Sequence, residues 1–397
     1  MSPSTSQHPR LRPACTCFII PSAVLRRYAA DAGTSTATRQ ALQNTAQETE
    51  RLRGLREAQR VAGLRDVDRL VPAAAGAKPL VPSQHLYDCA SRKALPGKPV
   101  PKPTGDYKQV FDTTAKVTEF YLKVLGRNSV DNKGFDLNSS LHYGVAYDNA
   151  FWNGAQMVYG DGDGQLFTKM FLSPDVIGHE LTHGVTQNES ALRYEGESGA
   201  LNESLSDVFG TVFNQWLNNW DVTEPRGWLV GAGIIAKPYQ AKGFTCLRDM
   251  VTPSAKHCLS PQPELYSQLD PSADVHDNSG VPNKAFALFA RALGGQAWGM
   301  ALLVWYDVAT NRTLRSDARM AEFAKLSVAA AKKRGGTKVQ SACRAAWKAV
   351  GIKACAPPRD TPRHTRHATL QQHRRAFPKA RPSNERGLDA TRPISTP

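Results

Sequence analysis

The 397-residue sequence has no apolar run of 18 residues or more, and no GxxxG stretch in an apolar context. A transmembrane helix needs about 20 consecutive apolar residues, so we expect no membrane span. Acidic residues are also scarce, because 35 Asp and Glu stand against 50 Lys and Arg, and the formal charge is +15 at pH 7. A basic excess of this size suggests nucleic acid as a partner.

The positions of the charges weaken that hypothesis. Residues 356–397 hold nine Arg or Lys against three acidic residues, and residues 1–80 add an excess of about six. The middle of the chain therefore carries only about +3. We expect a basic disordered tail over 356–397 and no specific nucleic-acid partner. Nonspecific attraction to acidic polymers or surfaces is the alternative.

Cysteines are few, and their number is odd. With seven cysteines, at least one cannot pair within the chain. Cys246 with Cys258, and Cys343 with Cys355, each enclose a short segment and are candidate disulfides in an oxidising compartment. No cysteine has the spacing to a histidine that is typical of a zinc site.

The motif HELTH at 179–183 carries the clearest chemistry in the sequence. On a helix, positions i and i+4 share a face, so His179 and His183 can bind one metal ion with Glu180 beside it. Asp175 falls in the first turn of this helix, and the apolar residues around the motif predict that the helix is buried. Buried polar side chains are costly unless they are used, which favours a zinc site over a chance surface helix.

A third zinc ligand is needed, because catalytic zinc typically takes three protein ligands and a water. The best supplier is the segment GALNESLSD at 199–207, where Glu203 and Asp207 are again four residues apart. A second helix would present both carboxylates on one face, so that one can bind zinc and the other can accept the ring N–H of His179. The segment that follows is apolar, which argues against a solvated acidic face.

HELTH followed after nineteen residues by the glutamate of GALNESLSD resembles the thermolysin family (M4) of neutral zinc metallopeptidases. Further segments resemble motifs of that family in the same order: YDNAFWNG at 147–154, QMVYGDGDG at 156–164, LRDM at 247–250 and VHDNSGVPNK at 275–284. The resemblance covers about residues 85–352. It implies a two-lobed α+β fold with a β-rich N-terminal lobe, an all-helical C-terminal lobe and the zinc helix between them.

The resemblance implies a metalloendopeptidase with one catalytic zinc ion. It assigns zinc binding to His179, His183 and Glu203. Asp207 would not bind zinc itself but would hydrogen-bond a ligand. Peptide bonds would be hydrolysed through a zinc-activated water, with Glu180 as the general base.

Five further residues receive roles from the resemblance. His276 and Tyr194 would donate hydrogen bonds to the transition state, where fixed donors are most effective. Asn149 and Ala150 would contact the substrate backbone, and Arg248 a substrate carbonyl. An edge strand near 149–150 would let the substrate add as an extra strand, so that binding depends little on substrate sequence.

The resemblance also places a specificity pocket for the side chain just after the cleaved bond. Its walls would be Phe167, Met170, Val176 and Leu247. Apolar walls cannot hold a charge cheaply, so we expect a preference for a bulky apolar residue at that position.

The sequence departs from the family in two places. The aspartate usually found five residues before the late histidine is replaced by Pro271, with Asp270 and Asp274 as candidate substitutes for orienting His276. Of the cluster that usually binds two calcium ions, Asp175 remains. The matching places hold Asn214, Gly227, Leu229 and Ala232. Calcium takes six to eight oxygen ligands, so we expect this double site to be absent.

The segment CFIIPSAVLRRYA at 17–29 resembles the start of the short propeptide of protealysin-type members, which implies a zymogen. A signal peptide is the competing interpretation, because Arg10 and Arg12 precede an apolar stretch. Pro21 inside that stretch and the arginines at 26–27 argue against it. We expect a secreted monomer without a clear classical signal peptide, acting on proteins or peptides.

Four regions are expected along the chain. They are a propeptide at 1–80, an N-terminal α/β catalytic lobe at 81–187, a helical catalytic lobe at 188–355 and the basic tail at 356–397. In the N-terminal lobe, short β-type runs surround one helix at about 113–125. The helical lobe is expected to end in two alanine-rich helices, at 317–332 and 339–350.

Two other functions remain to be weighed. A catalytically silent protein could keep the fold and hold an acidic partner with its basic ends, but it would have no use for Glu180 and His276 together. An aminopeptidase of the gluzincin group needs an acidic anchor for the substrate's amino terminus, and none is found near the motif at 147–154.

Overall fold

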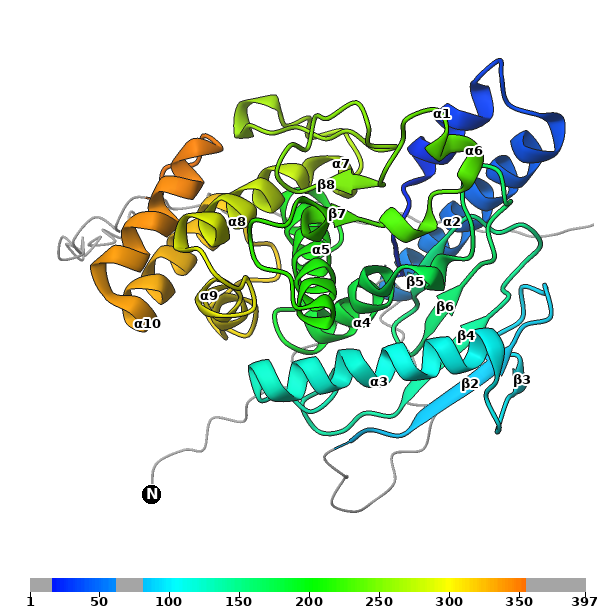
Figure 1. Cartoon of the computed structure of the whole chain (residues 1–397), viewed down its shortest axis with the longest axis horizontal. Coiled ribbons are helices and arrows are strands. Elements are labelled where there is room, and N and C mark those ends of the chain that lie inside the picture. The colour runs from blue at the N-terminus through cyan, green and yellow to red at the C-terminus, as the bar shows by residue number, and fades with distance from the viewer. Residues whose placement is uncertain (1–15, 62–80, 355–397) are drawn as a thin grey trace, which may run out of the picture. The chain divides into compact units, whose positions relative to one another are not determined.

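The computed structural model describes residues 16–61 and 81–354 (Figure 1). The expected tail, Cys355, and residues 1–15 and 62–80 of the expected propeptide lie outside the described residues. The N-terminal part contains a β-sheet and the C-terminal part is helical, which confirms the α+β class. Within the described ranges, no helix is both long enough and apolar enough to cross a membrane.

Six strands form the main sheet, in the order β1-β5-β6-β4-β2-β3. Their bounds are β1 (Cys17–Phe18), β2 (Gln84–Asp88), β3 (Lys98–Pro99), β4 (Leu137–Leu141), β5 (Ala150–Trp152) and β6 (Met157–Tyr159). The central strands β2, β4 and β6 are parallel, and β5 runs antiparallel to β6. The edge strand β1 comes from the expected propeptide and pairs antiparallel with β5, so that Phe18 lies opposite Phe151.

The expected propeptide also supplies two helices, α1 (Ser22–Ala30) and α2 (Thr36–Val61), drawn in blue in Figure 1. Helix α3 (Gly105–Leu125) packs against β2 and against α4 and α5, the two helices described next. It begins about eight residues earlier than the sequence predicts, because its first turn is polar and gives no apolar periodicity. It ends at Gly126, whose φ of 64° is the left-handed conformation common after a helix.

The centre of the fold is the crossing of α4 (Pro174–Asn188) and α5 (Gly196–Asn218). Two glycines meet there, since a Cβ added to Gly178 would lie 3.0 Å from the Cα of Gly210. A Cβ on Gly210 would lie 2.4 Å from the carbonyl oxygen of Asp175. The two backbones are therefore in direct contact, which lets side chains of both helices converge.

The C-terminal part is built from α8 (Gly280–Leu293), α9 (Met300–Ala309) and α10 (Met320–Ala349). Their core is aromatic, with the rings of Trp305 and Trp347 stacked at a centroid distance of 5.8 Å. Helix α10 contains two non-helical residues, Gly335 and Gly336, between the two alanine-rich segments that the sequence predicts as separate helices. Short elements complete the part: α6 (Lys237–Gln240), α7 (Val275–Asn278), and the hairpin of β7 (Leu229–Val230) with β8 (Arg248–Asp249).

The candidate disulfides of the sequence are wrong for this structure. Cys246 and Cys258 are buried free thiols whose sulfur atoms lie 3.6 Å apart, whereas a disulfide bond is about 2.05 Å long. Cys343 is also a free thiol, buried beside Ser327, and its candidate partner lies outside the described residues.

Replacing Gly210 by Ala should destabilise the protein by about 1–3 kcal/mol, the usual cost of overpacking. The added methyl group would press on the carbonyl oxygen of Asp175 and on the backbone nitrogen of His179, 2.9 Å away, and neither is a flexible side-chain end. Gly54→Ala in α2 is the control, because its methyl group meets nothing within 4 Å. Denaturant unfolding of both variants, in a Glu180→Gln background that prevents self-digestion, gives the comparison. Equal stability of the two variants would contradict the contact.

Candidate metal centre and active site

Helices α4 and α5 bring together the three side chains expected to bind zinc. His179 Nε2 and His183 Nε2 are 3.0 Å apart, and each lies 3.5 Å from an oxygen of Glu203. All three side chains are buried. A tetrahedral ion with bonds of about 2.0–2.1 Å would separate its ligand atoms by about 3.3 Å, so the triangle has the size that one zinc ion requires.

Both histidine rings also have hydrogen-bond partners at Nδ1, the ring nitrogen that faces away from the triangle. His179 Nδ1 lies 3.0 Å from the Asp207 carboxylate, and His183 Nδ1 lies 2.9 Å from Asn202 Oδ1 and 3.1 Å from Ser206 Oγ. A donor N–H at Nδ1 leaves Nε2 as the free acceptor that faces the metal. Asn202 and Ser206 had no role predicted from the sequence, although their four-residue spacing on α5 places them on one face.

The Asp207 carboxylate accepts several hydrogen bonds from the groups around the metal centre. The Arg248 guanidinium donates two hydrogen bonds to it, at 2.9 and 2.6 Å, and Asn283 donates a third at 2.9 Å. Burial alone would raise the pKa of Asp207, but the charges and hydrogen bonds of Arg248 and His179 together outweigh burial and hold the pKa below its ordinary value. Asp207 therefore stays ionised and fixes His179 and Arg248 together.

Glu180 differs from every carboxylate around it. It is fully buried, and neither of its oxygens makes a well-formed hydrogen bond with a described residue. Burial raises its pKa to about 8. An isolated buried carboxylate is costly, so the pair of unpartnered oxygens fits a site that takes a metal ion and a water. Burial also lowers the pKa of His183 to about 3, which keeps its ring in the neutral form that binds metals.

His276 and Tyr194 meet on the other side of Glu203. His276 Nε2 lies 3.2 Å from a Glu203 oxygen, and Tyr194 Oη lies 3.4 Å from the same ring nitrogen. The Tyr194 hydroxyl donates to Glu203, and His276 Nε2 donates to the carbonyl oxygen of Phe18. The two donors expected to act on the transition state thus point into one place, beside the metal triangle.

Asp274 orients His276. Its Oδ1 lies 2.5 Å from His276 Nδ1 and accepts the His276 backbone N–H at 3.0 Å. The other candidate, Asp270, instead accepts hydrogen bonds from Ser272. The sequence left this choice open, and the chain folds so that a residue two positions before the histidine replaces one five positions before it.

The residues expected to bind a substrate backbone all contact the segment at 17–20. Ile20 donates its backbone N–H to Asn149 Oδ1 at 3.0 Å, and Asn149 Nδ2 donates to the Ile20 carbonyl at 2.9 Å. The backbone N–H of Ile19 donates to the Ala150 carbonyl at 3.2 Å, and Arg248 donates to the Ile19 carbonyl at 2.9 Å. The segment therefore lies on β5 in the manner of an added strand.

The four residues expected to form the specificity pocket belong to one continuous apolar core. Phe167, Met170, Val176 and Leu247 are all fully buried there. Leu247 lies on the segment that continues into β8, where its N–H donates to the Val230 carbonyl at 2.9 Å. The side chains are apolar throughout, as the preference for an apolar residue requires.

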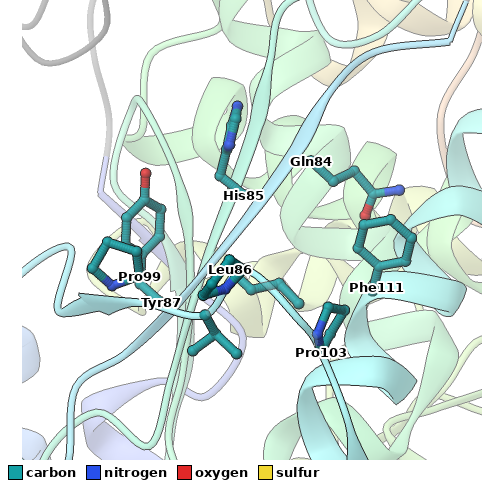
Figure 2. Close-up of a pocket in the computed structure, with 9 residues that line it drawn as sticks. Gln84, His85, Leu86, Tyr87, Pro99, Pro103 and Phe111 are labelled. Carbon is teal, nitrogen blue, oxygen red and sulfur yellow. The ribbon is translucent and has the colours of Figure 1, made fainter.

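A pocket of about 250 Å³ lies elsewhere, between β2, β3 and the start of α3 (Figure 2). It includes none of the residues described above. Its walls are formed by Gln84, His85, Leu86, Tyr87, Pro99, Val100, Pro101, Pro103 and Phe111. The pocket has no place in the expected chemistry.

Asp175, which remains from the expected calcium cluster, is bonded to protein groups. Its carboxylate accepts the Gly231 N–H at 2.5 Å and a hydrogen bond from Ser173 Oγ. These hydrogen bonds oppose the cost of its burial, which still raises the pKa of Asp175. The absence of the double calcium site stays a prediction.

Comparisons with known proteins agree with this geometry. The model of the thermolysin metallopeptidase catalytic domain matches residues 104–187, and that of the family's alpha-helical domain matches residues 190–352. An extracellular metalloprotease of Pectobacterium carotovorum subsp. carotovorum is 38% identical over 286 residues, which cover 68% of this chain and 81% of that protein. A thermolysin of Alicyclobacillus acidocaldarius subsp. acidocaldarius is 36% identical over 227 residues, or 54% of this chain and 39% of that protein.

A solved structure is similar over a longer part of the chain. The precursor of protealysin, a metalloproteinase from Serratia proteamaculans, superposes with a TM-score of 0.72 and 34% identity, covering 85% of this chain and 99% of that one. The buried His–His–Glu triangle, the family matches and this precursor agree. The chain belongs to the thermolysin (M4) family of metallopeptidases, in its protealysin-like group, and is a metalloendopeptidase.

Proposed function

We propose that the protein is a zinc endopeptidase that is made as an inactive precursor and cleaves before bulky apolar residues. The observation that carries the proposal is the triangle of His179, His183 and Glu203 beside the unpartnered carboxylate of Glu180. A silent binding protein has no reason to keep such a carboxylate buried, because burial without a partner costs free energy.

In this proposal the chain supplies a base and two fixed donors. Zinc held by the triangle would lower the pKa of a bound water towards about 7 and polarise the scissile carbonyl. Glu180 would accept the proton of the attacking water and deliver it to the leaving nitrogen. His276, oriented by Asp274, and Tyr194 would donate hydrogen bonds to the oxygen on which negative charge develops.

The substrate would bind where the segment at 17–20 lies. Asn149, Ala150 and Arg248 bind main-chain groups of that segment, and main-chain groups are the same in every peptide. A substrate strand can use the same three residues once the segment has left. Sequence preference must then come from side-chain pockets, which is the role we propose for Phe167, Met170, Val176 and Leu247.

Inhibition in the precursor would arise from two kinds of contact. The Phe18 carbonyl accepts the hydrogen bond of His276 that catalysis needs. Arg53 of α2 forms a 2.9 Å ion pair with Asp274, and its guanidinium lies over the Tyr194 ring, 5.6 Å from the centroid. The precursor thereby engages both proposed oxyanion donors, and also the residue that orients one of them.

We keep the division into propeptide 1–80, lobes 81–187 and 188–355 and basic tail 356–397 as part of the proposal. Secretion is proposed because the Pectobacterium relative is named an extracellular metalloprotease. Proteins and peptides are the proposed substrates of a monomeric enzyme.

Changing Glu180 to Gln should lower kcat by roughly two to four orders of magnitude, the usual contribution of general acid–base catalysis. Zinc should stay bound at one equivalent in the triangle, because the three ligands are unchanged. The variant is first processed by tagged wild-type enzyme, which is then removed, and peptide hydrolysis and zinc content are measured. The control is Glu119→Gln on α3, whose carboxylate lies in solvent-exposed pairs with Lys116 and Lys123. Near-normal turnover of the Glu180 variant would assign the base to another group.

Casein digests should show Leu, Phe, Ile or Val directly after most cleaved bonds. Each buried methylene contributes about 0.8 kcal/mol, so replacing Leu by Ala at that position of a test peptide should lower kcat/KM by about thirtyfold or more. Mass spectrometry of the digest and kinetics on the peptide pair provide the measurements. A majority of Asp, Lys or Gly after the cleaved bonds would refute the apolar pocket.

Wild-type protein should lose about 80 N-terminal residues on incubation, whereas the Glu180→Gln form should stay full length when purified alone. The expected cut lies in the Pro/Ala/Gly-rich region 71–83, where Leu80-Val81 offers apolar side chains. N-terminal sequencing and gel electrophoresis follow the change. If the inactive variant is trimmed at the same bond and rate, another protease does the cutting.

The contacts of Arg53 add a matched comparison to this experiment. Arg53→Ala should speed the loss of the propeptide severalfold, because it removes a partly buried ion pair with Asp274. Arg26→Ala is the control, since its pair with Glu50 in the same propeptide is exposed and contributes little. Equal processing rates of the two variants would remove Arg53 from the inhibitory contact.

A further inference from the structure

A second cluster of metal-binding side chains lies outside the active site, at the junction of two chain segments. Cys246 stands opposite Cys258 in an isolated parallel β-bridge. The bridge is fixed by two backbone hydrogen bonds, from Thr245 N–H to the His257 carbonyl at 3.0 Å and from Leu259 N–H to the Cys246 carbonyl at 2.9 Å. The main chain therefore sets both thiols side by side and places His257 next to them.

The three side chains form a triangle of metal-site dimensions. The two sulfur atoms are 3.6 Å apart, and His257 Nδ1 lies 3.7 Å from Cys246 Sγ and 4.0 Å from Cys258 Sγ. A tetrahedral ion with bonds of about 2.3 Å to sulfur and about 2.0–2.1 Å to nitrogen separates these atoms by about 3.6–3.8 Å. We propose that Cys246, His257 and Cys258 bind a second zinc ion, which is structural and separate from the catalytic one.

Groups around the triangle complete a site of this kind. His257 Nε2 lies 3.3 Å from the Asp249 carboxylate, the arrangement that orients a metal-binding imidazole from behind. Thr245 Oγ1 lies 2.7 Å from His257 Nδ1 and 3.7 Å from Cys246 Sγ, on the solvent side. The fourth position of the ion therefore falls to this hydroxyl or to a water.

The burial of the cluster suits an ion better than two free thiols. The cysteines are 0% and 1% exposed, while the side chain of His257 is 36% exposed and leaves a route from solvent. Zinc would supply the positive charge that two buried thiolates require.

Sequence spacing gave no sign of this site, because ten residues lie between Cys246 and the His257-Cys258 pair. Only the β-bridge brings the two parts together. The bridge also joins two functional segments. Arg248 lies two residues after Cys246, and the Leu259 carbonyl, next to Cys258, accepts hydrogen bonds from Arg27 and Tyr28 of α1. An ion here would fix the substrate-binding arginine and the docking point of the propeptide to one another.

The test counts zinc in the full-length Glu180→Gln protein, which does not depend on catalytic activity. After loading with zinc and removal of the excess, we expect two equivalents per chain. The double variant Cys246→Ser/Cys258→Ser, made in this background, should hold one, and so should His183→Ala. Cys343→Ser is the control, because that buried thiol contacts Ser327 and belongs to no cluster of metal-binding side chains among the described residues, and the variant should keep two.

Replacing zinc by cobalt identifies which of the two ions each variant has lost. A thiolate-to-cobalt charge-transfer band should be present in the Glu180→Gln protein and in its His183→Ala form, and absent from the Cys246→Ser/Cys258→Ser form. This readout separates the two sites, since loss of the catalytic ion alone would leave the band unchanged.

Asp249→Asn covers the case in which the double cysteine variant does not fold. Asn can keep the acceptor oxygen that binds the backbone N–H groups of Val251 and Thr252, at 2.8 and 3.0 Å. Loss of the charge behind His257 should lower zinc affinity at the second site by about 10- to 100-fold. Two zinc equivalents that survive loss of both cysteines, unchanged affinity in Asp249→Asn, or a Cys246–Cys258 disulfide in freshly purified protein would overturn the proposal.

Discussion

The backbone contact between α4 and α5 is the constraint on which the active site depends. Gly178 directly precedes His179, and Gly210 lies one turn after Asp207, so the close approach occurs at the level of the ligands. Ionisable groups buried at such density are costly unless they are paired. The two glycines let the helices approach closely enough for the ligands to converge, and Asp207 pairs with His179 and Arg248. A larger residue at either glycine would separate the triangle before any ligand was changed.

In the proposed mechanism, inhibition and substrate binding use the same atoms, which would make them mutually exclusive. The segment at 17–20 engages Asn149, Ala150 and Arg248 through its main chain, and its Phe18 carbonyl engages His276. A single inhibitory side chain would leave the backbone groups of β5 free to bind a peptide. An added strand instead occupies those backbone groups. Arg248 links this edge to the metal centre, since the same guanidinium binds Asp207. Under this proposal, departure of the propeptide would free a site that is already arranged.

The sequence predicted the features that follow from helical periodicity and motif spacing. His179, His183, Glu203 and Asp207 each lie four residues from a partner on their helix, so their convergence required only that α4 and α5 cross. The two-lobed α+β class followed instead from the resemblance to the thermolysin family. The start of α3 was missed because its first turn is polar, and the two-residue strand β1 is too short to show any periodicity.

Local geometry explains the remaining differences. Asp274 orients His276 through a turn at the start of α7, where its side chain also accepts the His276 backbone N–H, and no residue spacing encodes that turn. The Cys246–His257–Cys258 cluster depends on a β-bridge between segments ten residues apart. A helix places ligands at a fixed interval that can be read from the chain. A bridge places them at an interval set by the loop between its partners, so a metal site built on a bridge becomes visible only after the loop has been folded.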